Sequence, residues 1–147
     1  MVRDIFSGSG SSTPAGFTVM DGLLYFSATN GIDGVELWKS NGTTAGTVMA
    51  VNLNPGAASS SPGPITVMGG KLYFAADDGT NGKEMWKSDG TPGGTVFLGN
   101  MGPGTAGGVI SQLIPAGNLL YVEGRPTGAN IGSELWKTDG TPGGISL

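Results

Sequence analysis

Cysteine and histidine are both absent from this sequence. Their absence excludes disulfides, thiol nucleophiles, zinc sites built from Cys and His, and any Ser-His-Asp triad. Charged residues make up only 12% of the chain, and the seven basic residues are scattered along it. With a net charge of −4, this distribution argues against a surface that binds nucleic acid or an anionic membrane.

Long apolar segments are lacking as well. Residues 1–20 contain no run long enough for the core of a signal peptide or for a membrane span. We therefore expect a soluble chain with no signal peptide and no membrane insertion. The absence of cysteine does not decide the compartment, because proteins outside the cell can fold without disulfides.

Glycine is the residue that the sequence has in excess. The 147 residues include 29 glycines and 9 prolines, so roughly a quarter of the chain disfavours regular helix. Hydrophobic residues nevertheless reach 37%, which is typical of a folded chain and not of a disordered one. The length allows one domain of ordinary size, and the composition predicts a glycine-rich β protein.

A repeat of 48 residues organises the chain. The segment LYF at 24–26 returns at 72–74 and, as LYV, at 120–122. The segment ELWK at 36–39 returns as EMWK at 84–87 and as ELWK at 134–137, the last time after 50 residues. The third copy therefore has two extra residues, which we place within the loop 124–133.

Each repeat divides into four short segments rich in apolar, β-branched and aromatic residues, which we expect to be strands. In the middle copy these segments are 65–68, 71–76, 83–87 and 95–98. Gly-Gly, Asp-Gly and Asn-Gly pairs separate them, as short hairpins require. The longest connection, 54–63, is suited to cross from the outermost strand of one sheet, 47–53, to the innermost strand of the next.

Apolar residues that are neighbours in the sequence, such as Tyr25-Phe26 and Leu37-Trp38, indicate strands buried on both faces. Sheets stacked around an axis are buried in this way. The period, the strand number and the two-sided burial together predict an all-β chain of three four-stranded antiparallel β-propeller blades. A β-solenoid is the rival fold, but its coils are usually shorter and need no hairpin-linked strands.

The recurring segments ELWKSNGTTAGT, EMWKSDGTPGGT and ELWKTDGTPGGI resemble the ELWxxDGT repeat of large bacterial proteins. The departures from that pattern are Asn41 in place of Asp, Met85 in place of Leu, and Ile145 in place of the last Thr. The resemblance implies a tandem-repeat parent protein that is exported or located at the cell surface. It implies no activity that can be transferred to individual residues.

The two ends of the chain fall at one position of the repeat, since Met1 and Leu147 both correspond to Met49. The chain 1–147 thus holds three tandem repeats cut within an outer strand. We expect the C-terminal half of that strand in one copy to continue into the N-terminal half in the next; the residues concerned are Ile145, Ser146 and Leu147, and Val2, Arg3, Asp4 and Ile5. A cut at this point by chance is the alternative.

Three blades are too few to close a ring, because propellers have about four to eight. An open arc would expose two apolar sheet faces and a broken edge strand. Head-to-tail contact between identical chains removes both problems. The partner that we expect is therefore the chain itself, as a homodimer with six blades or, next, a homotrimer with nine; four chains stay open as a third possibility.

Three glutamates, Glu36, Glu84 and Glu134, recur two residues before a Trp in each repeat. A catalytic carboxylate pair is normally unique in a chain, whereas a structural contact recurs with the repeat. We therefore expect these side chains to accept hydrogen bonds from backbone or lysine groups at the blade edge. We expect no enzyme activity and no cofactor.

The recurring aromatic residues have two interpretations. They could form shelves on which sugars stack, or they could fill the space between blades. We favour the core role for all of them: Tyr25, Trp38, Tyr73, Trp86, Tyr121 and Trp136.

One loop of the middle repeat holds oxygen ligands of the kind that Ca²⁺ binds, namely Asp77, Asp78 and Asn81. The equivalent loops, 29–34 and 126–132, are poorer in carboxylates. Because Asp and Asn side chains also stabilise turns on their own, a turn is the simpler interpretation and we predict no metal site.

Two classes of function remain. The first is a non-enzymatic structural or interaction module that self-assembles into a closed propeller. The second is a lectin-like module that binds a glycan or another small ligand in the grooves between blades.

Overall fold

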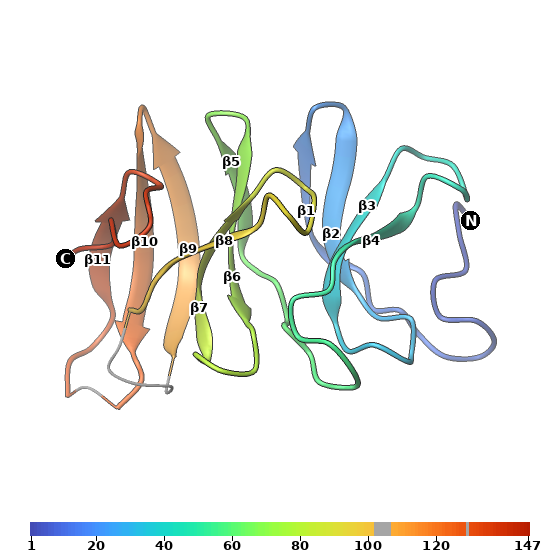
Figure 1. Ribbon diagram of the computed structural model, residues 1–147, viewed down its shortest axis with the longest axis horizontal. Coiled ribbons are helices and arrows are strands. Elements are labelled where there is room, and N and C mark those ends of the chain that lie inside the picture. Colours follow the sequence, from blue (N-terminus) through green and yellow to red (C-terminus); the bar gives the residue numbers. More distant parts are fainter. Residues whose placement is uncertain (102–106, 129) are drawn as a thin grey trace.

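The computed structural model describes residues 1–101, 107–128 and 130–147. These residues form three antiparallel sheets, and no helix is found among them. Figure 1 shows the sheets side by side in sequence order, with the two chain termini at opposite ends of the row. The predicted all-β class with antiparallel sheets is confirmed.

The first two sheets have four strands each, in sequence order across the sheet. Sheet 1 consists of β1 (Ala15–Met20), β2 (Leu23–Ala28), β3 (Glu36–Ser40) and β4 (Val48–Val51). Sheet 2 consists of β5 (Ile65–Met68), β6 (Lys71–Asp77), β7 (Lys83–Ser88) and β8 (Val96–Gly99). The strands expected in the middle repeat agree with β5 to β8 within one residue at each end.

Sheet 3 differs from the expected four strands. It has three, β9 (Gly108–Ala116), β10 (Leu119–Pro126) and β11 (Glu134–Thr138), in the order β11-β10-β9. At the place of a fourth strand there is a single bridge, in which Lys137 N–H donates to Ser146 O at 2.8 Å and Ser146 N–H donates to Lys137 O at 3.0 Å. The fourth strand of this sheet, which the sequence predicts to be shared between two copies, is present in the single chain only as this bridge.

The hairpins follow from the turn residues of the repeat. Asp21 and Gly22 join β1 to β2 with φ of 51° and 76°, and Gly69 and Gly70 join β5 to β6 with φ of 56° and 69°. Two consecutive positive φ values are typical of the two-residue hairpin turn whose twist matches that of the strands. Glycine, and to a lesser degree Asp and Asn, adopts this conformation without strain.

The strand register is the same in all three sheets. The Tyr of the second strand pairs with the Lys of the third strand in each sheet: Tyr25 with Lys39, Tyr73 with Lys87, and Tyr121 with Lys137. Residues at the same place in different repeats therefore occupy the same place in their sheets. We call such residues equivalent.

Apolar side chains fill the spaces between neighbouring sheets. Between sheets 1 and 2, Tyr25, Leu37 and Val51 pack on Leu72, Phe74 and Trp86. Between sheets 2 and 3, Tyr73, Met85 and Leu98 pack on Ile110, Leu120 and Val122. The middle sheet is thus buried on both faces, and the first strands β1, β5 and β9 contact one another in turn.

The end sheets each leave one face without a neighbouring sheet. We call these the outer face of sheet 1, which includes Phe17 and Val19, and the outer face of sheet 3, which includes Tyr121, Glu123 and Leu135. Phe17 is 60% exposed and Leu135 is 64% exposed. The described residues include no helix with the length and hydrophobicity needed to cross a bilayer.

Candidate interaction surface

The buried carboxylate of Glu36 joins sheet 1 to the segment that leads to sheet 2. Its Oε2 accepts a hydrogen bond from Leu53 N–H at 2.9 Å, and its Oε1 accepts one from Ser60 N–H at 2.9 Å. The Ser60 hydroxyl also donates to Oε2. The charge is removed from water but receives three donors, which is how a buried carboxylate stays favourable.

Glu84, the equivalent carboxylate in sheet 2, is equally buried but has fewer donors. Met101 N–H donates to Oε2 at 2.7 Å, while Oε1 has no hydrogen-bond partner among the described residues. Gly108 stands where Ser60 stands in the repeat, and a Cβ on Gly108 would lie 3.8 Å from Lys83 O. Burial and, to a lesser degree, nearby Asp78 together raise the pKa of Glu84 to about 7, in spite of the Met101 hydrogen bond.

Glu134 is placed in the same register but in a different environment. It pairs with Gly124 as Glu36 pairs with Ala28, yet its side chain is exposed. The structure therefore buries two of the three recurring glutamates and leaves the third exposed at the start of β11. The donors come from the link to a following sheet, and sheet 3 has no such neighbour in this chain.

Lysine and tyrosine side chains reach from each sheet into a turn of the next. Lys39 Nζ donates to Gly90 O at 3.2 Å, and Lys87 Nζ donates to Gly140 O at 2.6 Å. A Cβ on Gly90 would overlap the hydroxyl of Tyr25, and one on Gly140 would overlap that of Tyr73. These lysines bind carbonyl oxygens of the neighbouring sheet. In sheet 3, Lys137 is exposed and Tyr121 is half-buried.

The three tryptophans lie in the third strand of each sheet, and their rings are largely covered. Trp38 and Trp86 are buried and Trp136 is half-buried. The indole N–H of Trp86 donates to Ala76 O at 3.1 Å and that of Trp136 donates to Gly124 O at 3.0 Å, whereas the indole N–H of Trp38 has no partner among the described residues. The rings of Trp38 and Trp86 are therefore too buried for a sugar to stack on them.

The loop considered for calcium uses its oxygens within the turn. Asp78 Oδ1 accepts from Thr80 N–H at 2.9 Å and from Asn81 N–H at 2.8 Å, and Asn81 Nδ2 donates to Asp78 Oδ2. Asp77 Oδ1 accepts from Gly79 N–H at 2.7 Å. These hydrogen bonds lower the pKa of Asp78 although burial opposes them. Within 1–101, 107–128 and 130–147, no group of three or more Asp, Glu, His or Cys residues could hold a metal ion.

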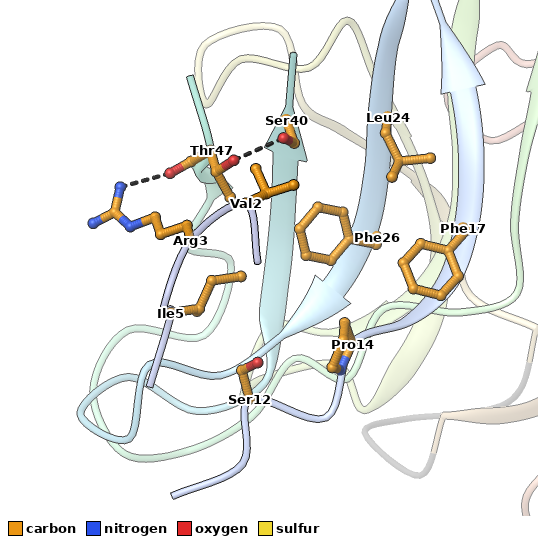
Figure 2. A pocket seen from close by; sticks show the side chains of 10 residues that line it. All are labelled: Val2, Arg3, Ile5, Ser12, Pro14, Phe17, Leu24, Phe26, Ser40 and Thr47. Carbon is orange, nitrogen blue, oxygen red and sulfur yellow. Dashed lines mark hydrogen bonds between the residues drawn. The ribbon is translucent and has the colours of Figure 1, made fainter. Parts of the chain in front are cut away.

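A largely apolar groove of about 240 Å³ lies on the outer face of sheet 1 (Figure 2). Phe17 and Phe26 form its sheet side, and the N-terminal segment forms the other side with Val2 and Ile5. Arg3 Nη1 donates to Thr47 O at 2.6 Å, which holds this segment along the edge of the sheet.

The residues expected to share a strand lie at opposite ends of the row. Val2, Arg3 and Ile5 line the groove on sheet 1, and Asp4 is exposed beside them. At the other end, Ile145 packs in the core between sheets 2 and 3, Ser146 bridges to Lys137, and Leu147 is exposed. The structure does not bring the two groups together within one chain.

The serine donors, and the contacts of the lysines and tyrosines with the next sheet, were not predicted from the sequence. A signal for the serines was present, because Ser12 and Ser60 are separated by 48 residues like the rest of the repeat. The contacts could not be read in the same way, since a period shows which residues are equivalent but not which residues they touch.

No family model, curated protein or solved structure matches this chain. The resemblance of its segments to the ELWxxDGT repeat therefore stays a prediction.

Proposed function

We propose that the chain is a non-enzymatic structural module that joins to further copies of itself, head to tail, and closes a β-propeller. The outer face of sheet 3 in one copy would cover the outer face of sheet 1 in the next. Each junction between copies would then repeat the packing of sheet 1 on sheet 2.

The apolar outer faces carry this proposal. Leu135 is 64% exposed, whereas its equivalents Leu37 and Met85 are 1% and 0% exposed within the two internal junctions. On the opposite end, Phe17 and Val19 are exposed while their equivalents Ile65 and Val67 pack in a core. Apolar surface of this extent normally marks an interface, and two complementary faces of one chain favour a ring.

The edge of sheet 3 supports the same arrangement. The bridge between Lys137 and Ser146 is equivalent to the pairs Lys39 with Val48 and Lys87 with Val96, which begin β4 and β8. A strand that begins at Ile145 and continues with Val2 to Ile5 of the next copy would complete the fourth strand. Two copies would then form six blades and three copies nine, and about four to eight blades is the usual range.

The mass of the 147-residue chain in solution tests the proposal. Light scattering should give two or three times 14.7 kDa. Leu135→Asp should reduce the mass to 14.7 kDa, because a charge would be buried without a partner. Val96→Asp, at an exposed position on β8 of the middle sheet, is the matched control and should keep the wild-type mass. A wild-type mass of 14.7 kDa at every concentration would overturn the proposal.

A glycan-binding role has one observation in its favour. A cavity of about 260 Å³ at the hairpin ends of sheets 2 and 3 is lined by Tyr73, Asn118 and Asp139, which combine an aromatic ring with polar groups. A glycan array probed with the wild type and with Asn118→Ala tests it. Signals that the variant loses would support binding there, and an array without signals would refute it.

A further inference from the structure

Glu134 occupies the place of Glu36 and Glu84 in its sheet but lacks the following link that buries them. We infer that a second copy supplies that link, so that the Glu134 carboxylate of one copy accepts hydrogen bonds from Ile5 N–H and from the N–H and hydroxyl of Ser12 in the next copy. This inference rests on the proposed ring and names the polar contact that locks its junction.

The donors follow from the internal junction between sheets 1 and 2. There Glu36 binds the backbone of Leu53 and both the backbone and the hydroxyl of Ser60. The residues 48 positions earlier are Ile5 and Ser12, which precede sheet 1 as Leu53 and Ser60 precede sheet 2. A copy placed on the outer face of sheet 1 would therefore present Glu134 to these two residues.

The receiving site already has the required shape in the single chain. Thr29 N–H donates to Ser12 O at 3.1 Å, and the equivalent Asp77 N–H donates to Ser60 O at 2.9 Å. Ile5 packs on the core of sheet 1 as Leu53 packs on the core between sheets 1 and 2. Ser12 lines the groove in Figure 2. The donors are thus held in place before association, which lowers the entropic cost of binding.

We expect the affinity between copies to depend on the residue at position 12, because its side chain would donate to the Glu134 carboxylate. Ser12 supplies a hydroxyl like Ser60, whereas Gly108 supplies none to Glu84. The junction between copies is therefore of the three-donor kind found at Glu36. A buried carboxylate with three donors stays charged at a small cost in free energy. A small cost matters at a junction between copies, because the carboxylate there leaves water each time two copies associate.

The open space at Gly42 is consistent with the same placement. A Cβ on Gly90 or Gly140 would collide with a tyrosine hydroxyl from the preceding sheet, whereas a Cβ on Gly42 would meet no atom within 4 Å. Gly42 is the equivalent turn residue of sheet 1, and Tyr121 is the equivalent tyrosine on the outer face of sheet 3. The copy that brings Glu134 to Ser12 would bring Tyr121 to Gly42.

A double-mutant cycle on the 147-residue chain tests the contact. The dissociation constant of the oligomer is measured by sedimentation for the wild type, Glu134→Gln, Ser12→Ala and the double variant. Each single change should weaken association by about ten- to a hundredfold, and the second change should add little to the first. Ser12→Thr keeps the hydroxyl and should restore tight association.

The controls separate this inference from the proposed ring. Asp78→Asn removes a carboxylate from sheet 2, where repeat 1 already has Asn30, and should leave the dissociation constant unchanged. An oligomeric wild type with strictly additive or unchanged variants would overturn the contact and leave the ring standing. A wild type that stays monomeric would overturn both. Circular dichroism of the variants checks that each one folds.

Two residues of opposite charge, Glu123 in one copy and Arg3 in the next, indicate a second contact at the proposed junction. This contact also rests on the proposed ring. Ser27, Leu37 and Val51 form one row across sheet 1, and Ala75, Met85 and Gly99 form the same row across sheet 2. In sheet 3 the row begins with Glu123 and Leu135, and its third position belongs to Arg3 of the next copy.

At the proposed junction this row contains two charged residues. The equivalent positions in the rows of sheets 1 and 2 hold uncharged residues. Glu123 and Arg3 would lie on one face, two strands apart and separated by roughly 10 Å between Cα atoms, which two long side chains can span. Glu123 is exposed in the single chain, and Arg3 holds Thr47 O with Nη1 only, so its other guanidinium N–H groups are available. An ion pair across the junction would compensate both charges as they are removed from water.

Charge reversal tests this pair. Arg3→Glu and Glu123→Arg should each weaken association by about tenfold or more, since like charges would then meet. The chain that carries both changes should bind more tightly than either single variant, although it does not regain the hydrogen bond to Thr47 O. A double variant as weak as the weaker single variant would overturn the ion pair, and one that binds more tightly than both would support it.

Discussion

The two internal junctions use the same glutamate in different ways. Between sheets 1 and 2, Glu36 receives three donors from Leu53 and Ser60. Between sheets 2 and 3, Glu84 receives one from Met101 and keeps an unpaired oxygen among the described residues. The two links differ at one position of the repeat, serine in one and glycine in the other, and the glycine has no hydroxyl to donate. The negative charge of the buried carboxylate is therefore better compensated at Glu36.

Removing the better-paired carboxylate should give the largest effect. Glu36→Leu leaves the N–H groups of Leu53 and Ser60 buried without an acceptor, which costs about 1–3 kcal/mol for each group. Glu84→Leu is the matched variant and should cost less, because only Met101 N–H loses its acceptor. Urea denaturation at one protein concentration measures both free energies of unfolding. Equal losses would show that the two junctions do not differ as described.

The pH dependence of stability should come from the poorer junction. The pKa of Glu84 rises from an ordinary value of 4.5 to about 7 in the folded chain. Between these values the folded state binds more protons than the unfolded state, so the free energy of unfolding falls as the pH rises. The loss should reach up to about 3 kcal/mol above pH 7.

Urea denaturation at about pH 5 and about pH 8 measures this loss, and Glu84→Gln should remove most of it. The carboxyl groups of Asp78, Asp89 and Asp139 have lowered pKa values because they accept hydrogen bonds within turns, so they titrate below this range. A Glu84→Gln variant with the wild-type pH dependence would contradict the assignment to Glu84.

Converting the better junction into the poorer one should give an intermediate effect. Ser60→Gly removes the hydroxyl donor from Glu36 and should lower the free energy of unfolding by about 2 kcal/mol at neutral pH. Ser59→Gly is the neighbouring control; it loses the hydrogen bond from Val35 N–H to the Ser59 hydroxyl but leaves Glu36 intact. If both variants were equally unstable, the loss would belong to backbone flexibility.

The reverse change should give the smallest effect. Gly108→Ser supplies a hydroxyl near Glu84 and should stabilise the chain by about 1 kcal/mol above pH 7, with a smaller pH dependence. The gain is limited because a Cβ there would lie 3.3 Å from Met101 Cβ and 3.4 Å from Arg125 O. Denaturation curves above and below pH 7 measure it, and a variant that is destabilised at both would contradict the prediction.

Much of the fold could be predicted from the sequence because the signals are local. The strands β5 to β8 lie where turn residues and apolar runs place them, and their register recurs because the turns recur. Sheet 3 contains the first three strands of the repeat, and its fourth strand, which the sequence predicts to be shared between copies, is reduced to one bridge. The repeat shows what a complete sheet contains, but pairing also needs a strand in reach, and only Ser146 bridges to Lys137.

The sequence predicted which parts of the chain form the candidate surface, but not the contacts that they make. The sequence placed Val2, Arg3 and Ile5 at an end of the chain that needs a partner, and they line a groove on the outer face of sheet 1. The sequence also predicted two exposed apolar sheet faces in an open arc but named no residues on them; Leu135 lies on one of these faces. The donors to Glu36 and the tyrosine contacts with glycine turns lie 17 to 67 residues away along the chain, a separation that no local pattern reports.

The sequence by itself determined the repeat, the strands and the turns, since each depends on side chains a few residues apart. Only the tertiary structure decided what becomes of the three recurring glutamates. Glu36, Glu84 and Glu134 lie in nearly the same local sequence, but among the described residues one is buried with three donors, one is buried with a single donor, and one is exposed. The physical reason is that burial and hydrogen bonding of each carboxylate depend on the link to the neighbouring sheet, which its own repeat does not contain.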